Sequence, residues 1–270
     1  MEWLRVPKKI YFKRGSTPVA LKELSQVYGL ERAFLLSDAA VYAEGIPGEI
    51  RQLIRKGHTE TAECIGVQQQ ATFADAKSGL PKMDEFQPDV IVGIGGTAVL
   101  DMAKIMWLMY EHPQLDIDQL VKTAGKPVSG DPEFPVMGNK AMLILIPTVP
   151  EAGAECSPFA TAVDENGKSC TIAGYNLLPE MVVIDADMMR NVSSEKLEAC
   201  GKDICKQAET TLAMKGVDDY VIGFAKDALR MATEALPDVV SKENYKRENA
   251  IEKMANAATL AGIATANAIY

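Results

Sequence analysis

Short apolar runs alternate with amphipathic stretches over the first two thirds of the 270-residue chain. The runs lack polar alternation, which is typical of parallel strands that are covered on both faces. We expect strands at 9–12, 32–37, 61–66, 90–92, 141–146 and 181–184, and helices at 18–28, 41–56, 71–86 and 98–111. The helix at 41–56 is expected to be interrupted near Gly45 and Pro47. Strands that alternate with helices predict an α/β fold built on a Rossmann-like parallel sheet.

The pattern changes near Asp185, where strand signals stop and helical periodicity takes over. We therefore predict a Rossmann-like domain at 1–185 and an all-α domain at 186–270. Before this boundary, 161–171 is expected to form a hairpin around Asn166-Gly167, and strand 141–146 is expected to stop pairing at Pro147. The proline- and glycine-rich stretch 122–138 predicts a long irregular connection.

Three glycines, Gly93, Gly95 and Gly96, follow the apolar run 90–92, and a helical pattern begins at once. Glycine lets a backbone turn sharply and approach a ligand without a Cβ in the way. The free N–H groups at a helix start, together with its dipole, attract phosphate. The alternative is a tight strand-to-helix turn that binds nothing.

Composition narrows the class of protein. No stretch approaches twenty uninterrupted apolar residues and no signal-peptide pattern is visible, so we expect a soluble, cytoplasmic protein that does not enter a membrane. The net charge of -9 argues against a nucleic-acid partner. Five scattered cysteines favour reduced thiols over a disulfide framework or a zinc site.

The glycine loop, with Asp101 and Lys104 on the following helix, resembles the coenzyme-pyrophosphate loop of the iron-containing alcohol dehydrogenases. Further segments resemble the alcohol-dehydrogenase half of bifunctional aldehyde–alcohol dehydrogenases: Glu2-Trp3, 6–12, Met106-Trp107, 109–113 and Ile146-Pro147-Thr148. The resemblance implies NAD(H)-dependent interconversion of a primary alcohol and an aldehyde. The cofactor-binding positions that it implies are Asp38, Gly93, Gly95, Gly96, Thr97, Asp101 and Thr148.

Asp38 stands at the end of a predicted strand, where a carboxylate can accept hydrogen bonds from an adenosine ribose. The family uses such an Asp to favour NAD over NADP. The alternative is a helix N-cap before Ala39.

The cofactor motifs are altered. Thr97 replaces a glycine of the family loop and Ala98 replaces a serine, although the backbone N–H groups survive. In the second family motif, Glu151 puts a negative charge where the family has glycine, and Pro150 removes a backbone donor. We therefore expect NAD binding to be weak.

The metal site that the resemblance implies needs one Asp and three His. Asp203 matches the Asp, Gln207 stands at the first His position, and the other two positions fall beyond Tyr270. An amide is a poor ligand for a first-row divalent ion, so we expect Asp203 to be vestigial and iron or zinc to be absent. His58 and His112 match no family position, so we assign no catalytic residue.

The resemblance further implies that 1–185 is the nucleotide-binding domain, that roughly the last third of a family member is missing, and that 186–270 is therefore only a partial helical domain. The apolar, alanine-rich helix at 247–268 would then lack its usual cover. We expect it to pack against a second copy or against a complementing protein. Three functions stay open: a degenerate dehydrogenase with little or no activity, a noncatalytic interaction subunit, and an enzyme that another polypeptide completes.

Overall fold

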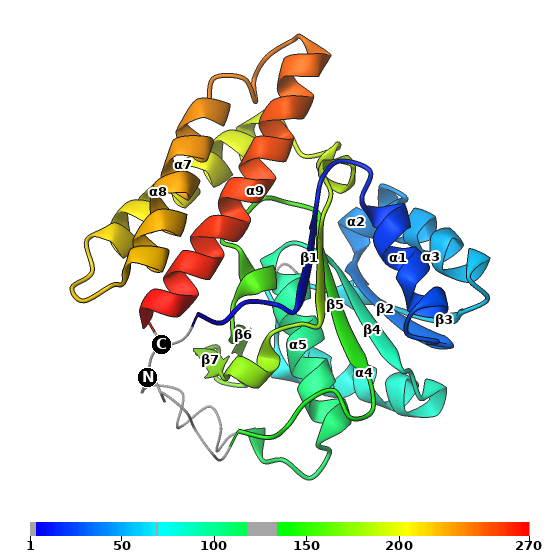
Figure 1. Ribbon diagram of the computed structural model, residues 1–270. Helices are drawn as coiled ribbons and strands as arrows, with labels where there is room; N and C mark the ends of the chain where they lie inside the picture. Colours follow the sequence, from blue (N-terminus) through cyan, green and yellow to red (C-terminus); the bar gives the residue numbers. More distant parts are fainter. Residues whose placement is uncertain (1–3, 69, 118–133, 270) are drawn as a thin grey trace.

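The computed structural model describes residues 4–68, 70–117 and 134–269. The Glu2-Trp3 match and positions 122–133 of the expected connection lie outside this range. Six parallel strands form the central sheet in the order β1-β8-β5-β4-β2-β3 (Figure 1). Their bounds are β1 Lys9–Phe12, β2 Arg32–Asp38, β3 Glu60–Val67, β4 Val90–Gly95, β5 Met142–Pro147 and β8 Met181–Ile184. The expected α/β fold is confirmed.

Helices cover both faces of this sheet (Figure 1). Their bounds are α1 Thr17–Gln26, α2 Ala39–Ala43, α3 Ile46–Lys56, α4 Phe73–Phe86 and α5 Thr97–Glu111. Along β4, Val90 and Val92 pack with α1 and α3, whereas Ile91 packs with α4 and α5. Burial on both faces explains why this strand has no polar alternation.

Local chemistry places the breaks between elements. The interruption expected within 41–56 is confirmed: Gly45 takes the left-handed conformation with φ 83° and separates α2 from α3. The predicted hairpin is confirmed as β6 (Phe159–Val163) and β7 (Ser169–Ala173). The expectation for Pro147 was wrong: it is the last residue of β5 and is paired with Gly95 of β4. At the strand end, proline forfeits only one donor of the ladder.

After Ile184, the described residues contain helices and no further strand. These are the 3-10 helix η3 (Ala186–Met189), α7 (Ser194–Leu212), α8 (Asp219–Ala235) and α9 (Asn244–Ile269). Figure 1 shows α7, α8 and α9 as a layer beside the sheet. Their alanines pack in one cluster with Val182 and Ile184 of β8, so the helical layer and the sheet share a core. The division into two domains stays a prediction.

The C-terminal helix has more cover than the sequence suggested. Ile251, Met254 and Ile263 of α9 are buried within this chain. They pack among residues of α7, α8 and η3, so the expectation that this face lacks cover was wrong. Association with a partner through this helix stays a prediction, and it can no longer rest on these three side chains.

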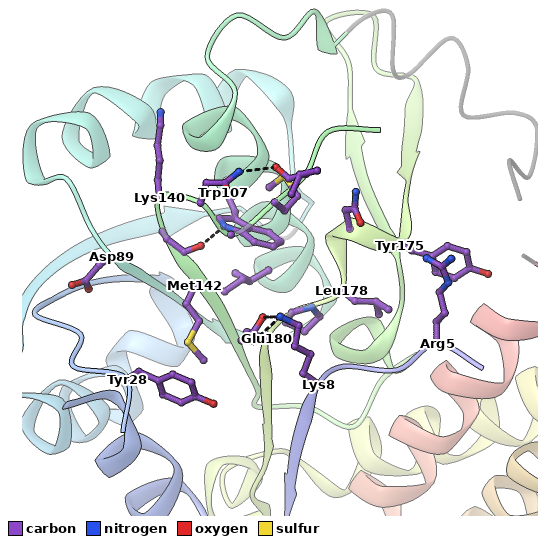
Figure 2. A pocket seen from close by; sticks show the side chains of 18 of the residues that line it. Arg5, Lys8, Tyr28, Asp89, Trp107, Lys140, Met142, Tyr175, Leu178 and Glu180 are labelled. Atoms are coloured by element: carbon purple, nitrogen blue, oxygen red, sulfur yellow. Dashed lines mark hydrogen bonds and ion pairs between the residues drawn. The ribbon is translucent and has the colours of Figure 1, made fainter. Parts of the chain in front are cut away.

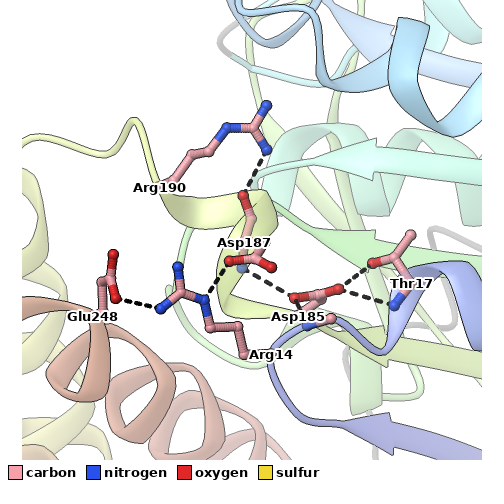
Figure 3. Close-up of polar contacts among 7 residues, drawn as sticks. Arg14, Thr17, Asp185, Asp187, Arg190 and Glu248 are labelled. Carbon is pink, nitrogen blue, oxygen red and sulfur yellow. Dashed lines mark hydrogen bonds and ion pairs between the residues drawn. The ribbon is translucent and has the colours of Figure 1, made fainter. Parts of the chain in front are cut away.

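Polar contacts join the segment after β8 and helix α9 to the loop between β1 and α1 (Figure 3). The Asp185 carboxylate accepts hydrogen bonds from Gly15 N at 2.8 Å and Thr17 N at 2.9 Å. Arg14 forms ion pairs with Asp187 of η3 and with Glu248 of α9, and so links these two elements.

Among the described residues, no helix has the length and apolarity to cross a membrane.

Candidate functional site

The carboxyl ends of β2, β4 and β5 border a cleft of about 680 Å³. From β2 the chain crosses outward to β3 and then returns to β4 on the other side of β2, so the connections diverge between β2 and β4. Parallel α/β sheets bind ligands at such a switch point. The residues that line this cleft include Asp38, Gly96, Thr97, Thr148, Glu151 and Lys196.

Asp38 closes β2 and begins α2. Its Oδ1 accepts a hydrogen bond from Val41 N at 2.8 Å, so the N-cap alternative is confirmed. The cap does not remove Asp38 from the site, because the residue also lines the cleft. Its second carboxylate oxygen is an acceptor of the kind that ribose hydroxyl groups need.

Thr148 directly follows β5, and its backbone N donates to Gly95 O at 3.0 Å. The residue is only 3% exposed, and its hydroxyl oxygen has no hydrogen-bond partner among the described residues. A buried polar atom without a partner costs free energy. Because Thr148 lines the cleft, a ligand hydroxyl or phosphate there would satisfy it.

The three loop glycines serve different purposes. A Cβ on Gly93 would come within 2.8 Å of Ala103, and one on Gly95 within 2.5 Å of Val99. Both glycines lie within β4 and allow α5 to pack closely on the sheet. Of the three, Gly96 lines the cleft, and a ligand contact at Gly93 and Gly95 stays a prediction.

The first turn of α5 already holds an anion. The Glu151 carboxylate accepts from Thr97 N at 2.8 Å and from Lys196 Nζ at 2.7 Å. Burial raises the pKa of Glu151, but the hydrogen bonds from Lys196 and Thr97 outweigh it and bring the pKa below its ordinary value. Lys196, in the first turn of α7, had no signal in the sequence, since the contact joins positions 45 apart.

Asp101 does not line the cleft with Asp38. It borders a separate cavity of about 210 Å³ with Thr97, Gln207 and Thr265. Its Oδ2 accepts from Thr161 N at 3.1 Å, and burial raises the pKa of its carboxyl to about 6. Of the seven expected cofactor positions, the structure therefore brings Asp38, Gly96, Thr97 and Thr148 to one cleft.

Lys104 is fully buried on α5 and holds the segment after β5. Its ammonium donates to the backbone oxygens of Ala154 at 2.6 Å, Ser157 at 2.8 Å and Phe159 at 2.8 Å. Burial lowers its pKa, whereas the nearby Asp101 raises it. Three carbonyl acceptors match the three donors of a charged ammonium, so Lys104 is a structural residue rather than a ligand contact.

The described residues do not fit the metal that the family resemblance implies. Asp203 is exposed on α7. Gln207 Nε2 donates to Ala152 O at 3.2 Å and Thr265 Oγ1 at 3.0 Å, so this amide already has protein partners. Within the described ranges, no three His, Cys, Asp or Glu residues come together as metal ligands. His112 caps α5 at the end opposite the cleft, and His58 is exposed after α3.

A second hollow, of about 760 Å³, lies at the amino ends of the strands (Figure 2). Charged side chains that line this hollow already contact other residues of the chain. Lys8 pairs with Glu180 at 2.8 Å, and the Arg5 guanidinium stacks 3.8 Å from the ring centroid of Tyr175. Since parallel sheets bind ligands at their carboxyl ends, we place the candidate site in the smaller cleft.

This chain is similar to known proteins in both sequence and fold. The bifunctional aldehyde-alcohol dehydrogenase AdhE of Escherichia coli (strain K12) is 34% identical over 269 residues, which are 99% of this chain and 30% of that protein. The iron-containing alcohol dehydrogenase from Thermococcus thioreducens superposes with a TM-score of 0.87 at 25% identity, over 99% of this chain and 67% of that one.

A sulfoacetaldehyde reductase from Bifidobacterium kashiwanohense, solved in complex with NAD+, superposes with a TM-score of 0.84 over 99% of this chain and 68% of that one. At 18% identity, it shows the fold alone. Residues 7–186, which include β1 to β8 and most of the cleft, match the family described as iron-containing alcohol dehydrogenase. The chain therefore belongs to the iron-containing alcohol dehydrogenase family.

Proposed function

We propose that the cleft binds NAD(H) weakly, mainly through its adenosine half, and that this chain alone has little or no alcohol dehydrogenase activity. The observation that carries the binding proposal is Thr148, which lines the cleft at the switch point of the sheet and whose buried hydroxyl has no hydrogen-bond partner among the described residues. Family membership supports the choice of NAD as the ligand.

The residues of the cleft suggest how the ligand would be held. Asp38 would accept hydrogen bonds from the adenosine ribose while it keeps capping α2. The Thr148 hydroxyl would gain a partner, which no described residue supplies. When bound, NAD(H) supplies the hydride acceptor or donor for alcohol and aldehyde chemistry.

Low activity follows from the metal position. A bound metal polarises an alcohol oxygen and lowers the pKa of the hydroxyl group. Asp203 alone cannot reproduce this effect. Gln207 is tied to Ala152 and Thr265, and an amide is in any case a poor ligand for a first-row metal. An assembly that supplies further ligands would remove this obstacle, and that alternative stays open with the noncatalytic interaction subunit.

Calorimetric titrations of the chain with ADP and with NADH test the binding proposal. We expect weak, saturable binding that Thr148→Val and Asp38→Ala each weaken about fivefold, the value of roughly one net hydrogen bond. Asp218→Ala is the matched control, because Asp218 caps α8 through Val221 N at 2.9 Å and does not line the cleft. Absence of saturation at millimolar ligand would refute the proposal.

Elemental analysis after anaerobic purification with added iron or zinc tests the activity proposal. We expect less than stoichiometric metal, no loss of metal on Asp203→Ala, and no gain of activity on Gln207→His alone. One equivalent of metal that disappears in Asp203→Ala, or measurable alcohol oxidation by the purified chain, would show that the site works after all.

A further inference from the structure

The Glu151 side chain occupies the position at which a ligand phosphate would meet α5. Its Oε2 lies 2.8 Å from Thr97 N, and a Cβ placed on Gly96 would lie 3.0 Å from the same oxygen. Its Oε1 lies 2.7 Å from Lys196 Nζ. One carboxylate thus accepts from both the helix start and the nearby cation, as a phosphate would.

This arrangement changes what the cleft can accept. A phosphate that approaches Thr97 N must displace the Glu151 carboxylate or lie beside its negative charge. Lys196 cannot attract that phosphate freely, because its charge is already paired. A neutral nucleoside that reaches only Asp38 and Thr148 meets neither obstacle.

Building on the binding function proposed above, we propose that Glu151 is a specificity-determining residue that takes the place of the ligand phosphate. The cleft then binds an uncharged adenine nucleoside in preference to a nucleotide or dinucleotide. Sequence position alone shows only that Glu151 replaces a glycine of the family motif. Its contacts with Thr97 and Lys196 turn that replacement into an occupied anion site.

Calorimetric titrations with adenosine and ADP test this proposal in the full chain. We expect the wild type to bind adenosine at least as tightly as ADP. Glu151→Gln and Glu151→Ala should raise ADP affinity by about tenfold, the value of one charge-assisted hydrogen bond, and should leave adenosine affinity nearly unchanged. Adding Lys196→Gln to Glu151→Gln should remove part of the gain, because the freed ammonium then no longer contacts phosphate.

Glu44→Gln is the matched control. Glu44 also lines the cleft, where it accepts from Asn191 Nδ2 at 3.3 Å, so its removal changes the charge of the cleft without opening the start of α5. It should leave the ratio of ADP to adenosine affinity unchanged. An equal shift in Glu44→Gln and Glu151→Gln would attribute the effect to general charge and overturn the inference.

The two proposals fail in different ways. If ADP binds the wild type more tightly than adenosine, or if the ratio is the same in Glu151→Gln, the specificity role is wrong and nucleotide binding stands. If neither ligand binds any variant, the binding function itself is wrong and the inference falls with it.

Discussion

Asp101 is only 6% exposed on α5, and its burial raises the pKa of the carboxyl to about 6 from an ordinary 3.8. Between these two values the unfolded chain ionises while the folded chain keeps the proton. The free energy of unfolding should therefore fall as pH rises from about 4 to 6, by up to about 3 kcal/mol from this group.

Urea denaturation of wild type and Asp101→Asn at several pH values between 4 and 7 measures this contribution. The stability of the wild type relative to the variant should decline with rising pH, because asparagine does not titrate. Asp164→Asn is a control of opposite sign, since the backbone N–H of Lys168 lowers the pKa of Asp164. A constant difference between wild type and Asp101→Asn would contradict the raised pKa.

Asp185 should contribute much of the stability of the contacts between the end of β8 and the start of α1 (Figure 3). It is 1% exposed and accepts from the backbone of Gly15 and Thr17 and from Thr17 Oγ1. Asp185→Ala leaves the two donors of the fully buried Thr17 without this partner, so we expect a loss of about 2–4 kcal/mol in chemical denaturation. Asp187→Ala removes only a partly exposed ion pair with Arg14 and should cost less than about 1 kcal/mol. Equal losses would mean that the buried cap is not decisive.

At the scale of elements, the packing of α9 depends on two facing glycines. A Cβ on Gly262 would lie 2.4 Å from Gly153 O, and one on Gly153 would lie 2.4 Å from Ala258 O. No side chain fits between these backbones without movement of the helix. Gly153 also has φ 71°, which disfavours any other residue.

We predict that Gly262→Ala lowers the free energy of unfolding by about 1–3 kcal/mol through overpacking. Gly223→Ala on α8 is the matched control, since no atom of the described residues lies within 4 Å of its added Cβ. That substitution should stabilise the chain by up to about 1 kcal/mol through helix propensity. Thermal melts of the two variants measure the contrast, and a stabilised Gly262→Ala would show that α9 can move away from the loop.

At the scale of the whole molecule, association through the end of α9 remains a prediction. Ile263 is buried, but Ile269 stays 43% exposed on the last turn. If this end contacts a second copy, Ile269→Asp should shift light scattering towards the monomer with little change in stability. Ile263→Asp is the contrasting variant, because a buried charge should unfold the chain whatever its oligomeric state. A wild type that is already a monodisperse monomer would mean that α7, α8 and α9 close the core without a partner.

The sequence by itself determined the parallel sheet, the succession of strands and helices along the chain, and the family. These follow from signals that are local along the chain: apolar runs such as 90–92, the break at Gly45, the Asn166-Gly167 turn, and family motifs of a few residues. It also placed Asp38, Gly96, Thr97 and Thr148 at strand ends, which parallel pairing then brings to one edge.

Only the tertiary structure decided what occupies that edge and what covers the helices. The contacts of Glu151 with Lys196, of Asp101 with Thr161 and of Gly262 with Gly153 each join segments far apart in the chain. The burial of Ile251 and Met254 likewise depends on α7 and α8. Hydrophobic periodicity shows that a side chain needs cover, but it does not show which distant element provides it, because that choice depends on how the elements pack in three dimensions.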